Sequence, residues 1–247
     1  MPARPRLLAA AAAAFALACA PAPALALDHD VQSWSLFFAQ GYVVPKLRWY
    51  AEVQPRFGND VSELDRLLVR PALGYQLTPA LSLWAGYAWT PLFSPEFRNE
   101  HRPFQQVLVE NKLDPLFLIN RTRFEQRIIE DADGVSLRLR HMVRGVVRFG
   151  DSPLGVAVYD EVFFTLTEPT GAPRRGFDQN RAFVGPNYKF SSVVQAEIGY
   201  MNNFINLPPG REDRMNHNIM FMLFASFPSP DAPAPAPPPP APAPAAP

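Results

Sequence analysis

The segment 121–127 carries a charged side chain at every second position. A β-strand has a side-chain period of two, so these charges would all project from the same face of a strand. The residues between them are Thr122, Phe124 and Gln126. The pattern therefore predicts a strand with one charged face. Its charged residues are Arg121, Arg123, Glu125 and Arg127.

Residues 135–149 repeat the alternation with stronger contrast. Valine, leucine and phenylalanine dominate one face, whereas the other carries Ser136, Arg138, Arg140, Arg144 and Arg148. A soluble sheet turns its apolar face inward and its charges toward water. Here the apolar faces are numerous and long, and the chain also begins with an export signal. Together these features predict an all-β, antiparallel outer-membrane β-barrel with lipid outside and charge inside.

The export signal is predicted over residues 1–26. Arg4 and Arg6 precede an apolar stretch from 7 to 18, and Ala24-Leu25-Ala26 is a typical cleavage site that would leave Leu27 as the mature start. An alternative is lipoprotein processing at the single cysteine, Cys19. Either route exports the protein, and cleavage after residue 26 leaves no cysteine for a disulfide.

Charge balance and the distribution of apolar and proline residues limit the kinds of protein that this chain can be. Lysine and arginine balance aspartate and glutamate at 23 each, which gives no electrostatic argument for nucleic-acid binding. No segment after the signal has the roughly 18 uncharged apolar residues of a spanning helix, so a closed barrel is the available membrane fold. Residues 228–247 are rich in proline and alanine and predict an extended tail, either a disordered end or a periplasmic tether.

Eleven segments between the signal and the tail read as strands. Single-chain bacterial barrels have even strand numbers, so we predict 10–12 strands and leave the parity open. The gaps alternate between short and long, which assigns 91–102, 167–178 and 205–213 to the cell surface. The segments are 31–40, 45–57, 64–77, 81–90, 103–111, 116–128, 135–149, 154–166, 179–190, 193–204 and 214–227.

The inferred lumen is rich in arginine and glutamate. Buried charges must be paired or solvated, so these side chains could fill the lumen with ion pairs. They could instead line a pathway, which would favour anions because basic residues are in excess. The principal candidates are Arg121, Arg123, Glu125, Arg127, Arg138, Arg140, Arg144, Glu161, Arg181 and Glu197; Arg48, Glu52, Arg66, Arg70 and Glu110 belong to the same inferred lumen.

Aromatic residues lie near the predicted strand ends and suggest interfacial girdles. Two polar residues break the apolar faces: His141 and Asp160 either lie near a rim or indicate a slipped register. The last strand ends in Phe227, which resembles the signal read by the barrel assembly machinery. The aromatic residues are Trp34, Tyr42, Trp49, Tyr75, Trp84, Trp89, Tyr188, Tyr200 and Phe227.

The charged motifs also resemble those of a known family. Their ordered set is similar to the signature of a bacterial domain-of-unknown-function family of predicted outer-membrane β-barrel proteins from Gram-negative species. The resemblance covers about residues 30–227, and it implies the fold and the location but no activity. The motifs are Glu100-x-Arg102-x-x-Gln105, Arg121-x-Arg123-x-Glu125-x-Arg127, Arg138-x-Arg140, Tyr159-x-Glu161-x-Phe163, Gln179-Asn180-Arg181 and Glu197-x-Gly199-Tyr200.

No motif predicts catalysis, a cofactor or a metal site. Outer-membrane lipid hydrolases place His and Ser two apart on a strand, and none of the four histidines has a serine at that spacing. We therefore expect a structural or surface role, or a narrow pore for small polar or anionic solutes. A soluble, lipocalin-like periplasmic binder is the alternative, and an enzyme is the third choice. Expected partners are outer-membrane lipid, lipopolysaccharide and the barrel assembly machinery.

Overall fold

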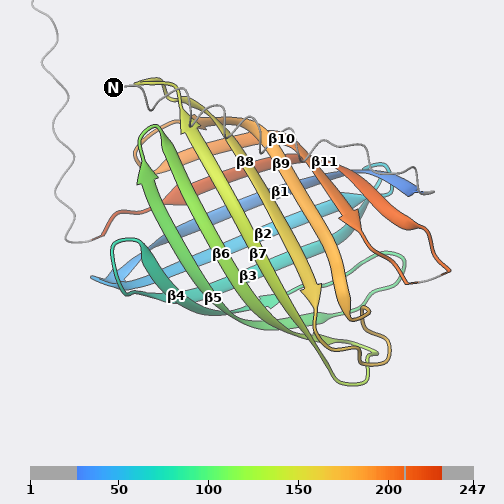
Figure 1. Ribbon diagram of the computed structural model, residues 1–247. Helices are drawn as coiled ribbons and strands as arrows, with labels where there is room; N and C mark the ends of the chain where they lie inside the picture. Colours follow the sequence, from blue (N-terminus) through green and yellow to red (C-terminus); the bar gives the residue numbers. More distant parts are fainter. Residues whose placement is uncertain (1–26, 209, 230–247) are drawn as a thin grey trace, which may run out of the picture.

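The computed structural model describes residues 27–208 and 210–229, which form one closed barrel of eleven strands (Figure 1). The prediction of 10–12 strands is confirmed, and the first two segments are separate strands. The signal peptide (1–26) and most of the Pro/Ala tail lie outside the described residues. The strands are β1 (Leu27–Val44), β2 (Leu47–Gly58), β3 (Glu63–Gln76), β4 (Leu81–Trp89), β5 (Glu100–Leu113), β6 (Leu116–Ile129), β7 (Val135–Arg148), β8 (Leu154–Thr165), β9 (Gly176–Lys189), β10 (Val194–Ile205) and β11 (Asp213–Ser226).

The barrel closes through a parallel pair. Each strand pairs antiparallel with its sequence neighbour, but β1 and β11 run in the same direction, with Leu27 opposite Asp213 and Gln40 opposite Ser226. An odd number of hairpin-connected strands brings the first and last strands together in parallel. The strand number of eleven therefore settles the parity that the sequence left open.

The two ends of the barrel differ in their connections. At one end, here called the short-turn end, the connections include 45–46, 77–80 and 114–115. At the long-loop end they include 90–99 and 166–175. β1 begins at the long-loop end, because it runs into the short turn 45–46. β11 is parallel to β1, so it ends at the short-turn end (Figure 1). Within the described residues, no helix is long and apolar enough to cross a membrane.

Charged and apolar side chains separate by strand register. Every arginine and lysine of the eleven strands shares the register of the lumen-facing side chains. Large apolar side chains are exposed on the outer face of every strand. The predicted inside-out polarity is thus present in the fold. One such residue from each strand, in chain order, is Phe37, Val53, Leu73, Leu83, Val107, Ile128, Val143, Val158, Val184, Ile198 and Ile219.

Some predicted girdle aromatics belong to the lumen instead. Trp34 and Trp84 are each 4% exposed. Their indole N–H groups donate to Gln32 at 2.9 Å and Ser82 at 2.8 Å, which lie two residues earlier on the same face. Assigning them to a girdle was wrong, because it used their distance from a strand end and ignored their register.

The ring of Trp84 packs over a glycine of the neighbouring strand. Gly74 lies directly opposite Trp84, and a Cβ atom at Gly74 would come within 2.3 Å of the indole Cδ2. Gly86 likewise lies opposite Phe104 and leaves room for its ring. These glycines allow large rings to lie flat against the inner wall.

The register does not slip at His141 or Asp160. Both side chains are on the outer face, where each meets a polar neighbour of the adjacent strand. Asn180 donates to Asp160 at 3.0 Å, and Thr122 lies 2.9 Å from the His141 ring nitrogen. Hydrogen bonding across the strands lowers the cost of polar atoms on an apolar face.

Candidate functional site

All ten principal lumen candidates project inward, from β6 to β10. The alternation along each strand fixes their direction, while cross-strand register decides which charges meet. They form three ion-paired groups and one arginine with neutral partners.

The largest group is a chain of arginines joined by two glutamates. Arg138 and Arg140 donate to the two carboxylate oxygens of Glu125, at 2.6 and 2.7 Å. Arg140 also donates to Glu161 at 2.8 Å, and Arg121 donates to the same Glu161 oxygen at 2.8 Å. Glu125 is fully buried. Burial of these charges is tolerable only because each glutamate accepts from two arginines.

A second group involves residues that the strand prediction placed in a loop. Glu100 accepts from Arg102 at 2.6 Å and from Arg127 at 2.5 Å. The prediction began this strand at residue 103, whereas β5 begins at Glu100. Glu100 and Arg102 share the parity of Phe104 and the other lumen residues of β5, and that alternation could have revealed them.

A third group joins β7, β9 and β10. Arg144 donates to Glu197, and the side-chain amide of Asn187 donates to the same carboxylate at 2.6 Å.

The largest group also includes Asp178, which the sequence analysis missed. Its carboxylate lies 3.4 Å from the guanidinium of Arg138. Asp178 lies within the register irregularity between β8 and β9, between the paired residues Phe177 and Gln179, so simple alternation could not assign it.

Arg181 differs from the other candidates, because it forms no salt bridge within the described residues. It donates to Gln179 at 2.9 Å and Asn203 at 3.3 Å, and its guanidinium lies against the rings of Trp34 and Phe163. A cation that has only amide and aromatic partners retains a positive field in the lumen.

The lumen is closed toward the long-loop end. Near that end, each of the eleven strands contributes an inward side chain that is at most 8% exposed. Ten of these eleven side chains lie outside the lining of the lumen cavity and only Arg56 borders it, so side chains fill this part of the lumen around its whole circumference. We call this ring the closed end: Gln32, Arg56, Leu68, Ala88, Arg102, Arg127, Ser136, Thr165, Gln179, Asn203 and Asn216.

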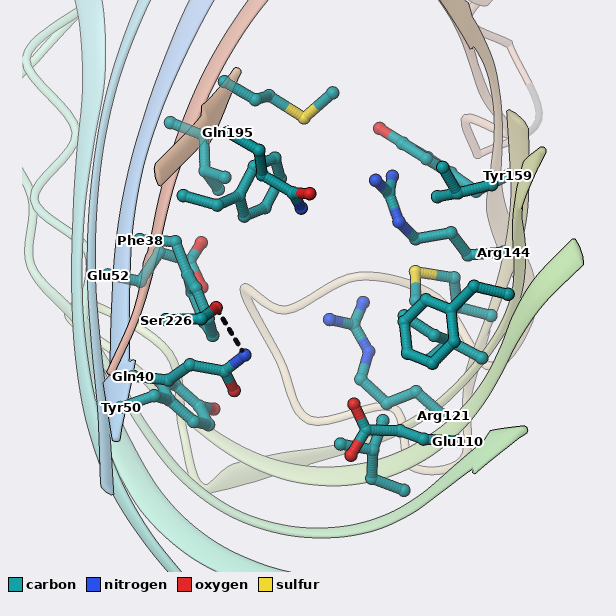
Figure 2. A pocket seen from close by; sticks show the side chains of 18 of the residues that line it. Phe38, Gln40, Tyr50, Glu52, Glu110, Arg121, Arg144, Tyr159, Gln195 and Ser226 are labelled. Carbon is teal, nitrogen blue, oxygen red and sulfur yellow. Dashed lines mark hydrogen bonds between the residues drawn. The ribbon is translucent and has the colours of Figure 1, made fainter. Parts of the chain in front are cut away.

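Toward the short-turn end the lumen contains a cavity of about 620 Å³. Its lining reaches the β9–β10 turn at Ser191 and Ser192, together with Gln40 and Ser226 at the ends of β1 and β11. Figure 2 shows Arg121 and Arg144 reaching into this space from one side, with Gln40, Tyr50 and Glu52 on the other.

The cavity wall is partly apolar, which the sequence analysis did not anticipate. Lumen-facing apolar residues interrupt the charged alternation, as Met142 and Val146 do between the arginines of β7. The described residues contain no group of three or more His, Cys, Asp or Glu side chains placed to hold a metal ion. The apolar lining includes Leu36, Phe38, Leu108, Phe117, Ile119, Met142, Val146, Met220, Met222 and Phe224.

Comparison with known proteins identifies relatives without an assigned activity. A family model described as a protein of unknown function (DUF2490) matches residues 31–216. An uncharacterised protein of Methylorubrum extorquens is 35% identical over 181 residues, covering 70% of this chain and 78% of the relative. No solved structure matches the chain.

Proposed function

The chain belongs to the DUF2490 family of proteins of unknown function, and we propose that it is an outer-membrane β-barrel that binds a small solute instead of conducting one. The observation that carries this proposal is a lumen with a cavity at one end and a ring of buried side chains at the other. It is a binding protein without enzymatic activity, and its partners in the envelope are outer-membrane lipid, lipopolysaccharide and the barrel assembly machinery.

The outer surface supports the membrane location. Soluble monomers rarely expose contiguous apolar patches beyond a few hundred Å². Here exposed apolar side chains occur on all eleven strands, and the strands are 9 to 18 residues long. About 9–11 residues suffice for a tilted strand to cross a bilayer. Contact with the hydrocarbon of a lipid bilayer would cover this apolar surface.

The unequal connections support an orientation. Outer-membrane barrels have short periplasmic turns and longer outer loops. The loop 166–175 would then face the cell surface, and the cavity would open toward the periplasm. In this orientation β11 leads toward the periplasm, which suits the interpretation of the Pro/Ala tail as a periplasmic tether.

The first test combines cell fractionation with planar-bilayer recording on the full-length protein. We expect the protein in the detergent-extracted outer-membrane fraction and no steady current from the inserted barrel. A matched variant replaces Glu100, Arg102 and Arg127 by alanine. It removes an ion-paired group from the closed end without leaving one of its charges unpaired, and it should show current.

Two results would overturn the proposal. Release by osmotic shock without detergent would favour the soluble, lipocalin-like binder. Steady wild-type current with a reversal potential set by anions would favour a narrow pore lined by arginine.

A further inference from the structure

We infer that the cavity binds an amphipathic anion, with its carboxylate or phosphate head against Arg121 and Arg144 and its hydrocarbon part against the apolar wall. This inference rests on the proposed binding function and names the chemical class of its ligand. The cavity volume of about 620 Å³ lies within the 300–1,000 Å³ typical of small-molecule sites.

The charge balance of the lining selects an anion. Eight arginines and two lysines line the cavity, against three glutamates, Glu52, Glu110 and Glu161. Glu125 and Glu197 behind the wall pair with Arg140 and Arg144, but the basic side chains remain in excess. Arg148 binds only the Pro153 carbonyl and the Gln195 side chain, and it forms no salt bridge within the described residues.

The position of Arg121 and Arg144 identifies where the head group would lie. They occupy adjacent strands on the same face, since Arg121 pairs with Met142 and Arg144 pairs with Ile119. Their guanidinium groups extend into the open space (Figure 2). Arg121 keeps one carboxylate partner, and its Nε has no hydrogen-bond partner among the described residues. Two neighbouring guanidinium groups suit the oxygens of a carboxylate or phosphate.

The apolar wall makes an inorganic anion a poor match. Phe117 and Val146 lie beside these arginines on β6 and β7, and Phe38 and Phe224 lie on the paired strands β1 and β11. In an empty cavity this apolar surface would contact water. A hydrocarbon chain or ring would bury it, which is favourable by about 25 cal/mol per Å² of apolar surface.

The test is calorimetric titration of the full-length barrel in nanodiscs, with empty nanodiscs as the baseline. The probes are decanoate, decyl phosphate, decyltrimethylammonium, decanol and inorganic phosphate. We expect saturable, one-to-one binding of decanoate or decyl phosphate, and binding at least about tenfold weaker for the other three probes. Comparing the two anionic probes distinguishes a fatty-acid-like head from a phospholipid-like head.

Two variants localise the site. Arg121→Gln with Arg144→Gln should weaken binding about 10- to 100-fold, because charge-assisted hydrogen bonds are lost. Leu108→Trp places a larger side chain at the apolar wall, which fills part of the cavity and keeps every charge. It should therefore weaken binding, and it tests the site even if the arginine variant does not fold. Arg175→Gln removes an exposed arginine of the loop 166–175, outside the cavity lining; it is the control and should change affinity less than threefold.

Unchanged binding in both the folded arginine variant and Leu108→Trp would overturn the inference, as would equal affinity for decyltrimethylammonium. Failure of the ligand class is distinguishable from failure of the proposed function. A folded, non-conducting barrel that binds neither anionic probe overturns the ligand class alone, whereas a conducting wild-type barrel overturns the binding function.

Discussion

The two ends of the lumen contain the same kinds of residue but differ in how their arginines are paired. At the long-loop end, Glu100 is shared by two arginines, and the neighbouring side chains are buried. In the cavity, arginines exceed carboxylates and face an apolar wall. An arginine-rich lumen is therefore insufficient to indicate a pore. Whether it is filled or open depends on how many carboxylates face the arginines and on how closely the side chains pack.

The largest expected difference concerns carboxylates in the two environments. Glu125→Ala removes the shared carboxylate of Arg138 and Arg140, so we expect a loss of about 3–5 kcal/mol in the free energy of unfolding. The matched variant Glu110→Ala affects Arg48, which also binds Gln76 and Gln40, and it should cost about 1 kcal/mol or less. Urea unfolding in detergent, followed by tryptophan fluorescence, measures both. Equal losses would contradict the distinction between a packed and an open half.

The second comparison concerns aromatic packing. Phe104 is 1% exposed and packs against Gly86 and the guanidinium of Arg123, so Phe104→Ala should cost about 3–4 kcal/mol. Phe117 borders the cavity, and Phe117→Ala should cost about 1–2 kcal/mol because it enlarges an existing space. The same unfolding measurement compares the two. A larger loss at Phe117 would mean that its wall of the cavity is packed as tightly as the surroundings of Phe104.

The smallest expected effect is at the rim of the parallel closure. Arg214 donates to Asp28 at 3.0 Å, but both side chains are well exposed. Arg214→Ala should therefore change the free energy of unfolding by less than about 1 kcal/mol, and added salt should reduce this small effect further. A loss comparable to that of Glu125→Ala would show that this exposed pair holds the barrel closed.

Much of the fold followed from local patterns. The side-chain period of two located all eleven strands and placed Arg138, Arg140 and Arg144 in the lumen. The boundary errors arose where lumen residues are apolar or lie beside a loop. The start of β5 was placed three residues late, which left Glu100 and Arg102 out of the inferred lumen although both belong to a motif shared with the family. Trp34 and Trp84 were assigned to girdles because strand ends were considered without register.

The sequence predicted the residue types of the candidate site and the face on which they lie, but not which of them pair. Arg144 meets Glu197, 53 positions away, and Arg48 meets Glu110, 62 positions away. Such pairs depend on the stagger between strands and on the curvature that carries side chains across the lumen. The apolar wall was missed for the same reason. The sequence shows single apolar residues among charges on each strand, but it does not show that those of different strands meet.

The sequence by itself determined which residues form strands and which face of each strand carries charge, because both follow from a repeat of two residues along the chain. Tertiary structure alone decided that an odd number of strands closes through the parallel β1–β11 pair, that Glu125 is shared between Arg138 and Arg140, and that the lumen is filled at one end and open at the other. These features depend on cross-strand register and closure, which relate residues far apart in the chain.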